Sequence, residues 1–240
     1  MTSFVIKLIA YICMFLSHMG TLLYMRVPYE YYYVSYLIGR LCFPIFAYFI
    51  VEGWKYTKSK YKYLLRLLIF GLVSAVPFYL AFDYGRSDPG FEFDVIITLF
   101  LGACCLLLQD LTWDKMEPKF RFLVILSLLP IVPGIFIEMD FGWYGILAIW
   151  LMGFVGRLTD KKWVKILVLM GAMALTYMVP MRYRGWISFL CTFPAYIMLL
   201  LYNGKRGPRL GYFFYIFYPA HLILVFVLNY FLPGGVLHAG

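Results

Sequence analysis

Residues 4–25 read FVIKLIAYICMFLSHMGTLLYM, an apolar run long enough to cross the hydrocarbon core of a bilayer as an α-helix. Two side chains within it can carry a full charge, Lys7 and His18. Ionisable groups at membrane depth are costly, so each is first interpreted as part of a functional site. Lys7 and His18 are eleven positions apart. On an α-helix, eleven steps of about 100° return to within roughly 20° of the same face and rise about 16 Å. We therefore expect Lys7 near one membrane surface and His18 deeper on the same stripe. The structural alternative is a Lys that snorkels to the interface and a His bonded to a neighbouring helix.

The composition of the whole chain is that of a membrane protein. Its 240 residues are 64% hydrophobic and only 14% charged, whereas soluble domains carry about 25% charged residues. No linker, repeat or low-complexity stretch divides it, so we expect one all-α domain over residues 1–240. The five cysteines lie in apolar runs without the spacing of a disulfide framework or a metal site, and we predict no bound metal.

Apolar windows of membrane-spanning length predict a polytopic helical bundle of about nine transmembrane helices, with a range of eight to ten. The windows are 4–25, 34–54, 63–82, 93–109, 121–138, 141–157, 163–181, 186–202 and 210–231.

The distribution of Lys and Arg predicts the orientation in the cell membrane. With a cytosolic N-terminus, the basic clusters between alternate spans all fall inside, as the positive-inside rule requires. The Lys58–Lys62 turn is then cytosolic and the Ser87–Gly90 loop external. The net charge of +9 is therefore a topology signal and does not indicate nucleic-acid binding. The cluster from Trp54 to Lys62 fits a phosphorylated ligand or anionic membrane lipids, or a simple stop-transfer turn.

Arg40 is the second charge expected at membrane depth. Its position in the second span places it about 9–10 Å below the outer boundary, the same depth as His18. Pro44, four residues later, is expected to free the Arg40 carbonyl and to kink the helix. A guanidinium beside an imidazole favours the neutral His that a general base needs. The alternative is a structural Arg bonded to helix carbonyls.

Three further polar residues are candidates for the membrane core. Glu52 is expected to pair with Arg66 across the hairpin between the second and third spans. His221, near the middle of the last span, is either a second catalytic group or a His bonded to a neighbouring helix. Asp140 is placed to orient a His, to receive an amine or to cap a helix.

Several motifs, in their order along the chain, resemble the TraX family, named for the F-pilin acetylase of conjugative plasmids. They are Ile6–Ala10 with Ser17–Gly20, Ile38–Phe46 through Val51–Gly53, Lys62–Leu67, Thr98–Leu99 with Leu101–Gly102, Asp140–Gly145, Tyr202–Gly207 and Phe214–Leu222. The spacing from Lys7 to His18 is also similar to the basic-x10-His signature of acyltransferase family 3 and its relatives.

The resemblance implies a membrane acyltransferase that takes an acyl group, usually acetyl, from cytosolic acyl-CoA. It makes His18 the general base, with Arg40 or a backbone amide stabilising the oxyanion. The family usually has Asp immediately before this His, whereas this chain has Ser17, a departure that implies a shifted acceptor, a weaker base or a lost activity.

The donor and the acceptor follow from the same reading. Lys7, Lys55, Lys58 and Arg66 supply the cations that bind the phosphates of CoA. The acceptor is an amine or hydroxyl of a pilin-like peptide, a glycan or a lipid-linked molecule, presented at the membrane or its outer side. A transporter or flippase for a polar solute is the alternative from another class, and an inactive assembly partner is a third.

Overall fold

The computed structural model describes residues 1–24, 26–82, 91–114, 116–208 and 213–231, and the Ser87–Gly90 loop lies outside them. The described parts are helical apart from an isolated bridge between Phe93 and Met139. The elements are α1 (Ser3–Leu22), α2 (Tyr29–Gly39), α3 (Cys42–Tyr56), α4 (Lys60–Phe82), α5 (Val95–Gln109), the π-helical turn η1 (Asp110–Asp114), the 3-10 helix η2 (Pro118–Ile131), α6 (Pro133–Phe136), α7 (Gly142–Leu158), α8 (Lys162–Leu190), α9 (Phe193–Leu200) and α10 (Phe213–Phe231).

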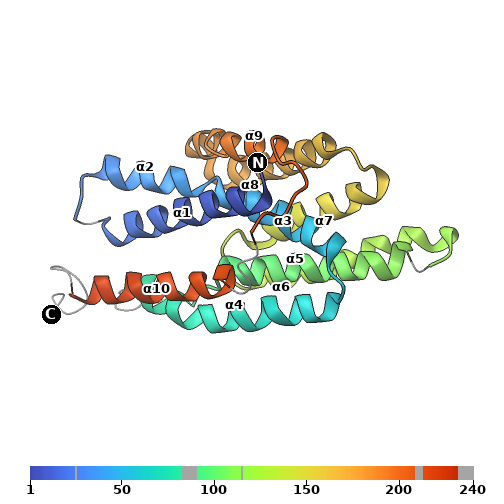
Figure 1. Cartoon of the computed structure of the whole chain (residues 1–240), viewed down its shortest axis with the longest axis horizontal. Helices are drawn as coiled ribbons and strands as arrows, with labels where there is room; N and C mark the ends of the chain where they lie inside the picture. Colours follow the sequence, from blue (N-terminus) through green and yellow to red (C-terminus); the bar gives the residue numbers. More distant parts are fainter. Residues whose placement is uncertain (25, 83–90, 115, 209–212, 232–240) are drawn as a thin grey trace.

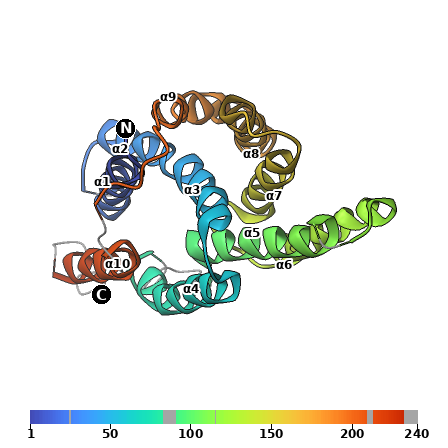
Figure 2. The same cartoon turned by 45° about the vertical axis from the view of Figure 1, so that its right-hand side comes forward.

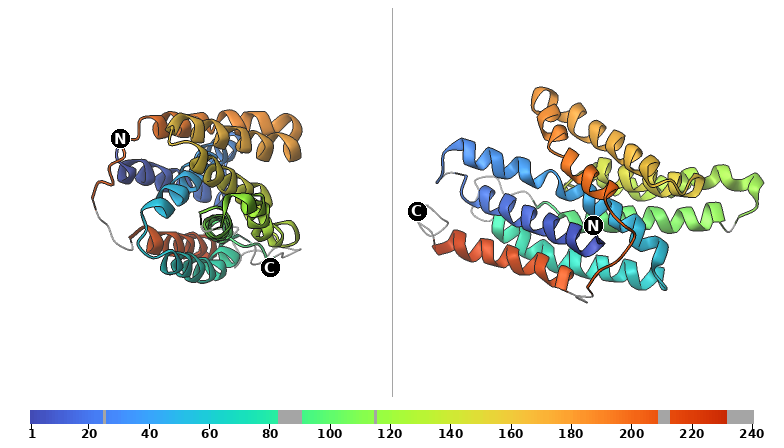
Figure 3. Two further views of the ribbon diagram at one scale, coloured as in Figure 1. Left: turned by 90° about the vertical axis from the view of Figure 1, so that its right-hand side faces the viewer. Right: turned by 45° about the horizontal axis from the view of Figure 1, so that its top comes forward.

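This architecture confirms the predicted all-α membrane bundle. In the described chain, five helical segments are long and apolar enough to cross a membrane, and three shorter helices are also apolar. Figures 1 and 3 show α1, α4, α5 and α10 extending along the long axis of the molecule. Figure 2 shows α3 between the pair α1 and α2 on one side and α7 on the other.

The predicted second span is broken at Arg40. Helix α2 ends at Gly39, and α3 begins at Cys42 after a turn at Arg40 and Leu41. Pro44 explains the break, because it lacks the N–H that would bond the Arg40 carbonyl and its ring crowds that oxygen. The expected kink therefore places Arg40 at the junction between two helices.

Two predicted windows differ from the helices observed. Windows 163–181 and 186–202 were expected as separate spans, but α8 continues unbroken to Leu190. It ends there because Pro194 has no N–H for the Leu190 carbonyl. Window 121–138 is mainly the 3-10 helix η2, followed by the single turn of α6, with prolines at 130 and 133 near the junction.

Helices α1 and α10 pack side by side and run in the same direction. Polar contacts join residues 203 positions apart at three levels, Ser3 to Arg206, His18 to His221 and Arg26 to Asn229. The segment before α10 sets this register, because its backbone bonds directly to the N-terminal residues 1–4. The two ends of the chain are thereby brought together along one seam.

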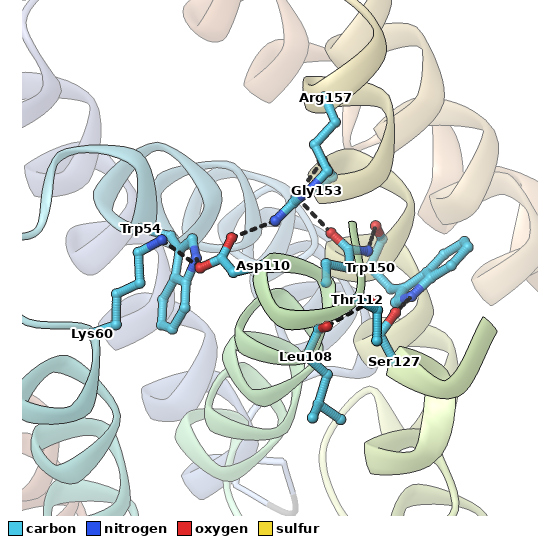
Figure 4. A network of polar contacts seen from close by, with 10 residues as sticks. Trp54, Lys60, Leu108, Asp110, Thr112, Ser127, Trp150, Gly153 and Arg157 are labelled. Atoms are coloured by element: carbon cyan, nitrogen blue, oxygen red, sulfur yellow. Dashed lines mark hydrogen bonds and ion pairs between the residues drawn. The ribbon is translucent and has the colours of Figure 1, made fainter. Parts of the chain in front are cut away.

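The Lys-rich connections meet at one end of the bundle. Asp110, the first residue of η1, accepts hydrogen bonds from Trp54 Nε1, at 3.0 Å, and from Lys60 and Arg157, so it joins α3, α4 and α7 (Figure 4). Lys55 pairs with Asp160 at 3.3 Å. These connections lie at the right-hand end of Figure 1, opposite the turn between α1 and α2.

Candidate functional site

A small cavity of about 120 Å³ gathers the residues that the sequence singled out for chemistry. Ser17 and His18 reach it from α1, Arg40 from the junction of α2 and α3, and Asp140 from the turn before α7. Its remaining wall is Met14, Thr21, Tyr36, Gly39, Cys42, Phe43, Phe46, Val95, Phe141 and Tyr218. The site is therefore a half-buried group of polar side chains beside a mainly apolar and aromatic wall, a setting in which charge interactions are stronger than in water.

His18 and His221 form a direct pair beside this cavity. His18 Nδ1 lies 2.8 Å from His221 Nε2, and the two rings stack with centroids 5.0 Å apart and 10° between their planes. His221 is only 4% exposed, whereas His18 is half-buried because its ring borders the cavity. His221 thus lies behind His18, on the side away from the cavity.

The hydrogen bonds of the pair fix its tautomers. His221 Nδ1 lies 3.0 Å from the carbonyl oxygen of Phe217, which can only accept, so this nitrogen carries the proton. In a neutral ring, His221 Nε2 is then an acceptor, and His18 Nδ1 must donate to it. This leaves the lone pair of His18 on Nε2, in a ring that borders the cavity, which is the tautomer that a general base requires.

Arg40 is held in place by aromatic rings and by backbone. Its guanidinium carbon lies 3.9 Å from the centre of the Tyr36 ring and 5.9 Å from that of Tyr177 on α8. Its Nε also donates to the Tyr36 carbonyl at 3.4 Å. Asp140 lines the same cavity, so a half-buried cation and a half-buried carboxyl group lie near each other beside the His pair.

A strained turn positions Asp140. Its N–H donates to the Phe93 carbonyl at 2.9 Å, and its own carbonyl accepts from the hydroxyl of Thr98. Phe141 follows with φ of 63°, a conformation that bulky residues rarely adopt. This turns its ring onto Phe43, with 4.0 Å between centroids. The N-cap of α7 is Phe141, so Asp140 is a cavity residue and not the helix cap.

A second and much larger cavity, of about 1080 Å³, lies toward the Lys-rich end. Of the predicted donor-binding residues, Lys7, Lys58 and Arg66 line it. Lys62 and Arg206 line it too, with Glu52 as the one acidic side chain among its described lining residues. The cations at Lys58, Lys62 and Arg206 are exposed, whereas Lys7 and Arg66 are half-buried. The cavity is strongly basic along its depth.

In two places the contacts of this region differ from those expected. Lys55 does not line the cavity, because its exposed ammonium turns outward to Asp160 on the α7–α8 connection. Glu52 and Arg66 line the same cavity, but the ion pairs of the described residues do not include one between them. Arg66 Nε donates instead to the Lys62 carbonyl at 3.3 Å.

Comparisons with known proteins bear on the whole chain. The model of the family described as "TraX protein" matches residues 3–229. The chain belongs to the TraX family. A relative in Dichelobacter nodosus, named probable fimbrial assembly protein FimC, serogroup H1, is 30% identical over an alignment of 237 positions that covers 93% of this chain and 94% of the relative. No solved structure matches the chain significantly.

The motifs that resembled TraX converge in space. His18 and His221 come from motifs at opposite ends of the sequence, and Arg40 and Asp140 from two motifs between them. The motif from Tyr202 to Gly207 bonds to the first residues of α1 and contributes Gly204 and Arg206 to the large cavity. These TraX motifs therefore build two neighbouring cavities.

Sequence reasoning missed three residues in or beside these sites. Arg206 was interpreted only as part of a cytosolic basic cluster, although its position in a motif was the available signal. Tyr177 gave no signal, because an aromatic residue in an apolar span is ordinary. Asp94, fully buried, caps α5 through Ile96 and Ile97, and an Asp before an apolar run was a readable sign of that cap.

Proposed function

We propose that this TraX protein is an acyl-CoA-dependent acyltransferase, with acetyl as the most suitable acyl group. The observation that carries the proposal is the pair of cavities along α1, one basic and large at Lys7 and one small and polar at His18. The rise of about 16 Å between these residues is comparable to an extended pantetheine arm. A donor bound by its phosphates in the first cavity brings its thioester to the second.

The large cavity suits the donor in charge and in depth. CoA carries three phosphate groups, which would lie among the exposed cations of Lys58, Lys62 and Arg206 at the entrance. Lys7 and Arg66 lie deeper and would meet the inner phosphates or the start of the pantetheine arm. Arg and Lys are the residues that bind phosphates by charge-assisted hydrogen bonds.

The small cavity suits the transfer step. His18 Nε2 takes the proton of the acceptor as the acceptor's nitrogen or oxygen attacks the thioester carbonyl carbon. Arg40 stabilises the negative charge that develops on the carbonyl oxygen. The C–S bond then breaks, and the CoA thiolate takes the proton from His18. His221 keeps Nδ1 of His18 protonated in the resting state, so that Nε2 is the basic atom.

The acceptor that we propose is an amine or hydroxyl of a surface-fibre subunit, a pilin-like peptide. The name of the Dichelobacter nodosus relative, a fimbrial assembly protein, supports this class over a glycan or a lipid-linked molecule. We further propose that the protein lies in the cytoplasmic membrane with its N-terminus and the Lys-rich end in the cytosol. That orientation follows the positive-inside rule and exposes the donor cavity to cytosolic acyl-CoA.

The deciding experiment combines donor binding with label transfer. Purified protein should be thermally stabilised by acetyl-CoA or CoA through mass action, and less by dephosphorylated pantetheine thioesters. Membranes containing the protein should move radiolabelled acetyl from acetyl-CoA to a peptide fraction. A folded protein that millimolar CoA does not stabilise, and whose membranes acquire no label, would overturn the proposal in favour of a transporter.

A further inference from the structure

Phe46 on α3 lies in the wall between the two cavities. Among the described residues that line them, it is the one common to both. It is also the one residue from 41 to 50 that is not fully buried. Both observations are those expected of a side chain that borders one cavity on each of two sides.

The residues around Phe46 form one continuous path. On α1, Lys7 and Tyr11 line the large cavity, while Met14 and His18 line the small one. These positions share one face of the helix, at steps of three and four residues. On α3, the residues after Phe46 line the large cavity and those before it, nearer to Arg40, line the small one. The two cavities are therefore consecutive parts of one channel that Phe46 interrupts.

Aromatic contacts hold Phe46 across this channel. Its ring centroid lies 5.1 Å from that of Tyr11, which in turn lies 5.3 Å from Phe217 on α10. Phe217 stacks on His221 at 5.3 Å. Such ring contacts contribute about 0.5–1.5 kcal/mol each beyond their buried area. A change in the rotamer of Phe46 alone can break these contacts. No movement of packed helices is needed.

We propose that Phe46 is a gate between the donor cavity and the His18 cavity, which the pantetheine arm of the acyl donor displaces to deliver its thioester. This inference rests on the proposed function. The closed gate keeps water in the large basic cavity away from His18, and the arm of the bound donor takes the place of the ring. Phe46 is thus a positioning and specificity residue, not a catalytic one.

The gate protects the donor from hydrolysis. If water reaches the thioester beside His18, its oxygen attacks the carbonyl carbon and its proton passes to Nε2. The C–S bond then breaks, and acetate and CoA thiol are formed without transfer. Exclusion of water is a general reason for enclosing reactive intermediates. Phe46→Ala should therefore raise acetyl-CoA hydrolysis relative to transfer.

A native cysteine allows a test that does not depend on turnover. Cys42 lines the small cavity, and its thiol donates to the Ala10 carbonyl at 3.2 Å. With the other four cysteines changed to Ala, the rate at which 2-aminoethyl methanethiosulfonate modifies Cys42 reports access to this cavity. Phe46→Ala should raise that rate by about an order of magnitude, because thiol modification depends on access. Phe46→Trp should lower it.

The matched control is Phe49→Ala, the same truncation one turn away on α3, where the ring lines only the large cavity. It should leave the Cys42 rate unchanged. A second control retains only Cys105, which is fully buried and lines neither cavity. If Phe46→Ala also speeds the modification of Cys105, the variant has loosened the fold. The modification rate of Cys42 in Phe46→Trp, which should be slower than in wild type, then decides whether Phe46 controls access to the small cavity.

The outcomes separate the gate from the proposed function. Equal Cys42 rates in wild type, Phe46→Ala and Phe46→Trp would overturn the gate and leave the transferase proposal standing. A raised rate in Phe46→Ala that CoA suppresses supports both, because the donor then occupies the path. A raised rate that CoA does not suppress supports the partition but overturns the passage of the donor arm and its binding in the large cavity.

Discussion

The Nδ1 atom of His18 lies 2.8 Å from Nε2 of His221, although 203 residues separate them in the chain. The same offset relates Ser3 to Arg206, so the register set at the N-terminus is kept to membrane depth. The proposed general base is therefore assembled from the first and last described helices. Its hydrogen bond to His221 decides which nitrogen is basic, and this makes the pair the unit to test.

His221→Ala should lower the maximal rate of acetyl transfer by about 100-fold, within the range of a general-base contribution. Without the Nε2 acceptor, the ring of His18 is no longer held in one tautomer or in one orientation, and such misplacement of a catalytic group can cost about 100-fold. The donor concentration for half-maximal rate should change little, because His221 does not line the large cavity. Transfer of labelled acetyl at varied acetyl-CoA concentration measures both.

His221→Gln is the matched variant for this prediction. Its side-chain oxygen can accept from His18 Nδ1 as the imidazole did, so it should recover part of the rate that His221→Ala loses. If both variants kept the wild-type rate, His221 would be a packing residue. Equal and complete loss in both would instead mean that the imidazole itself carries the proton.

His18→Ala should abolish transfer and leave CoA-induced thermal stabilisation intact. The variant removes the proton acceptor, whereas the cations that we propose for the phosphates lie in the other cavity. Lys7→Ala should do the reverse, raising the donor requirement while sparing much of the maximal rate. A well-folded His18→Ala protein with full activity would refute the assignment of the base.

Two neighbouring lysines can show which basic residues bind the phosphates of CoA. Lys58→Ala should weaken CoA binding, measured as a smaller thermal shift, because Lys58 lines the large cavity. Lys55→Ala, three residues away in the same basic cluster, should leave the shift unchanged, because Lys55 turns outward to Asp160. Arg206→Ala should behave like Lys58→Ala. Equal loss in the two lysine variants would indicate a diffuse charge effect and no defined site.

The local features of this molecule could be predicted from the sequence. The face shared by Lys7 and His18 follows from helical periodicity, and the break at Arg40 follows from the missing N–H of Pro44. Membrane class and the helical bundle follow from composition and from window length. The depth estimate also brought Arg40 and His18 to one level, and the structure places both on one small cavity.

The remaining features depend on tertiary packing that a single sequence does not encode locally. The pairing of His18 with His221 requires the register between α1 and α10, which the backbone bonds of residues 1–4 set. Lys55 and Lys58 look alike in sequence, and only the course of the α3–α4 turn sends one outward. The end of α8 was misplaced because hydropathy reports polar residues and not the backbone hydrogen bond that Pro194 removes.

Ser17→Asp should retain or increase transfer, because the resemblance to TraX proteins implies an Asp at this position. Ser17 lines the small cavity together with Arg40, so the new carboxylate gains a cation nearby. Its side chain also packs on Gly39, where an added Cβ would lie 2.4 Å from Ser17 Oγ. Ser17→Leu, a control of larger volume without charge, should lose activity. A rate for Ser17→Asp as low as that of Ser17→Leu would contradict the prediction.

Gly20→Ala should destabilise the protein by about 1–3 kcal/mol, the usual cost of overpacking a close contact. Helices α1 and α2 approach each other through small residues, and an added Cβ at Gly20 would lie 1.6 Å from Ser35 Oγ and 2.5 Å from Ser35 Cβ. Ser35 cannot easily yield, since its hydroxyl donates to the Tyr32 carbonyl at 2.7 Å.

Gly171→Ala is the matched control, because nothing lies within 4 Å of the added carbon on α8. It should be neutral or raise stability by up to about 1 kcal/mol through better helix propensity. Thermal unfolding in detergent measures both variants, and equal midpoints would show that the α1–α2 contact is looser than the structure indicates.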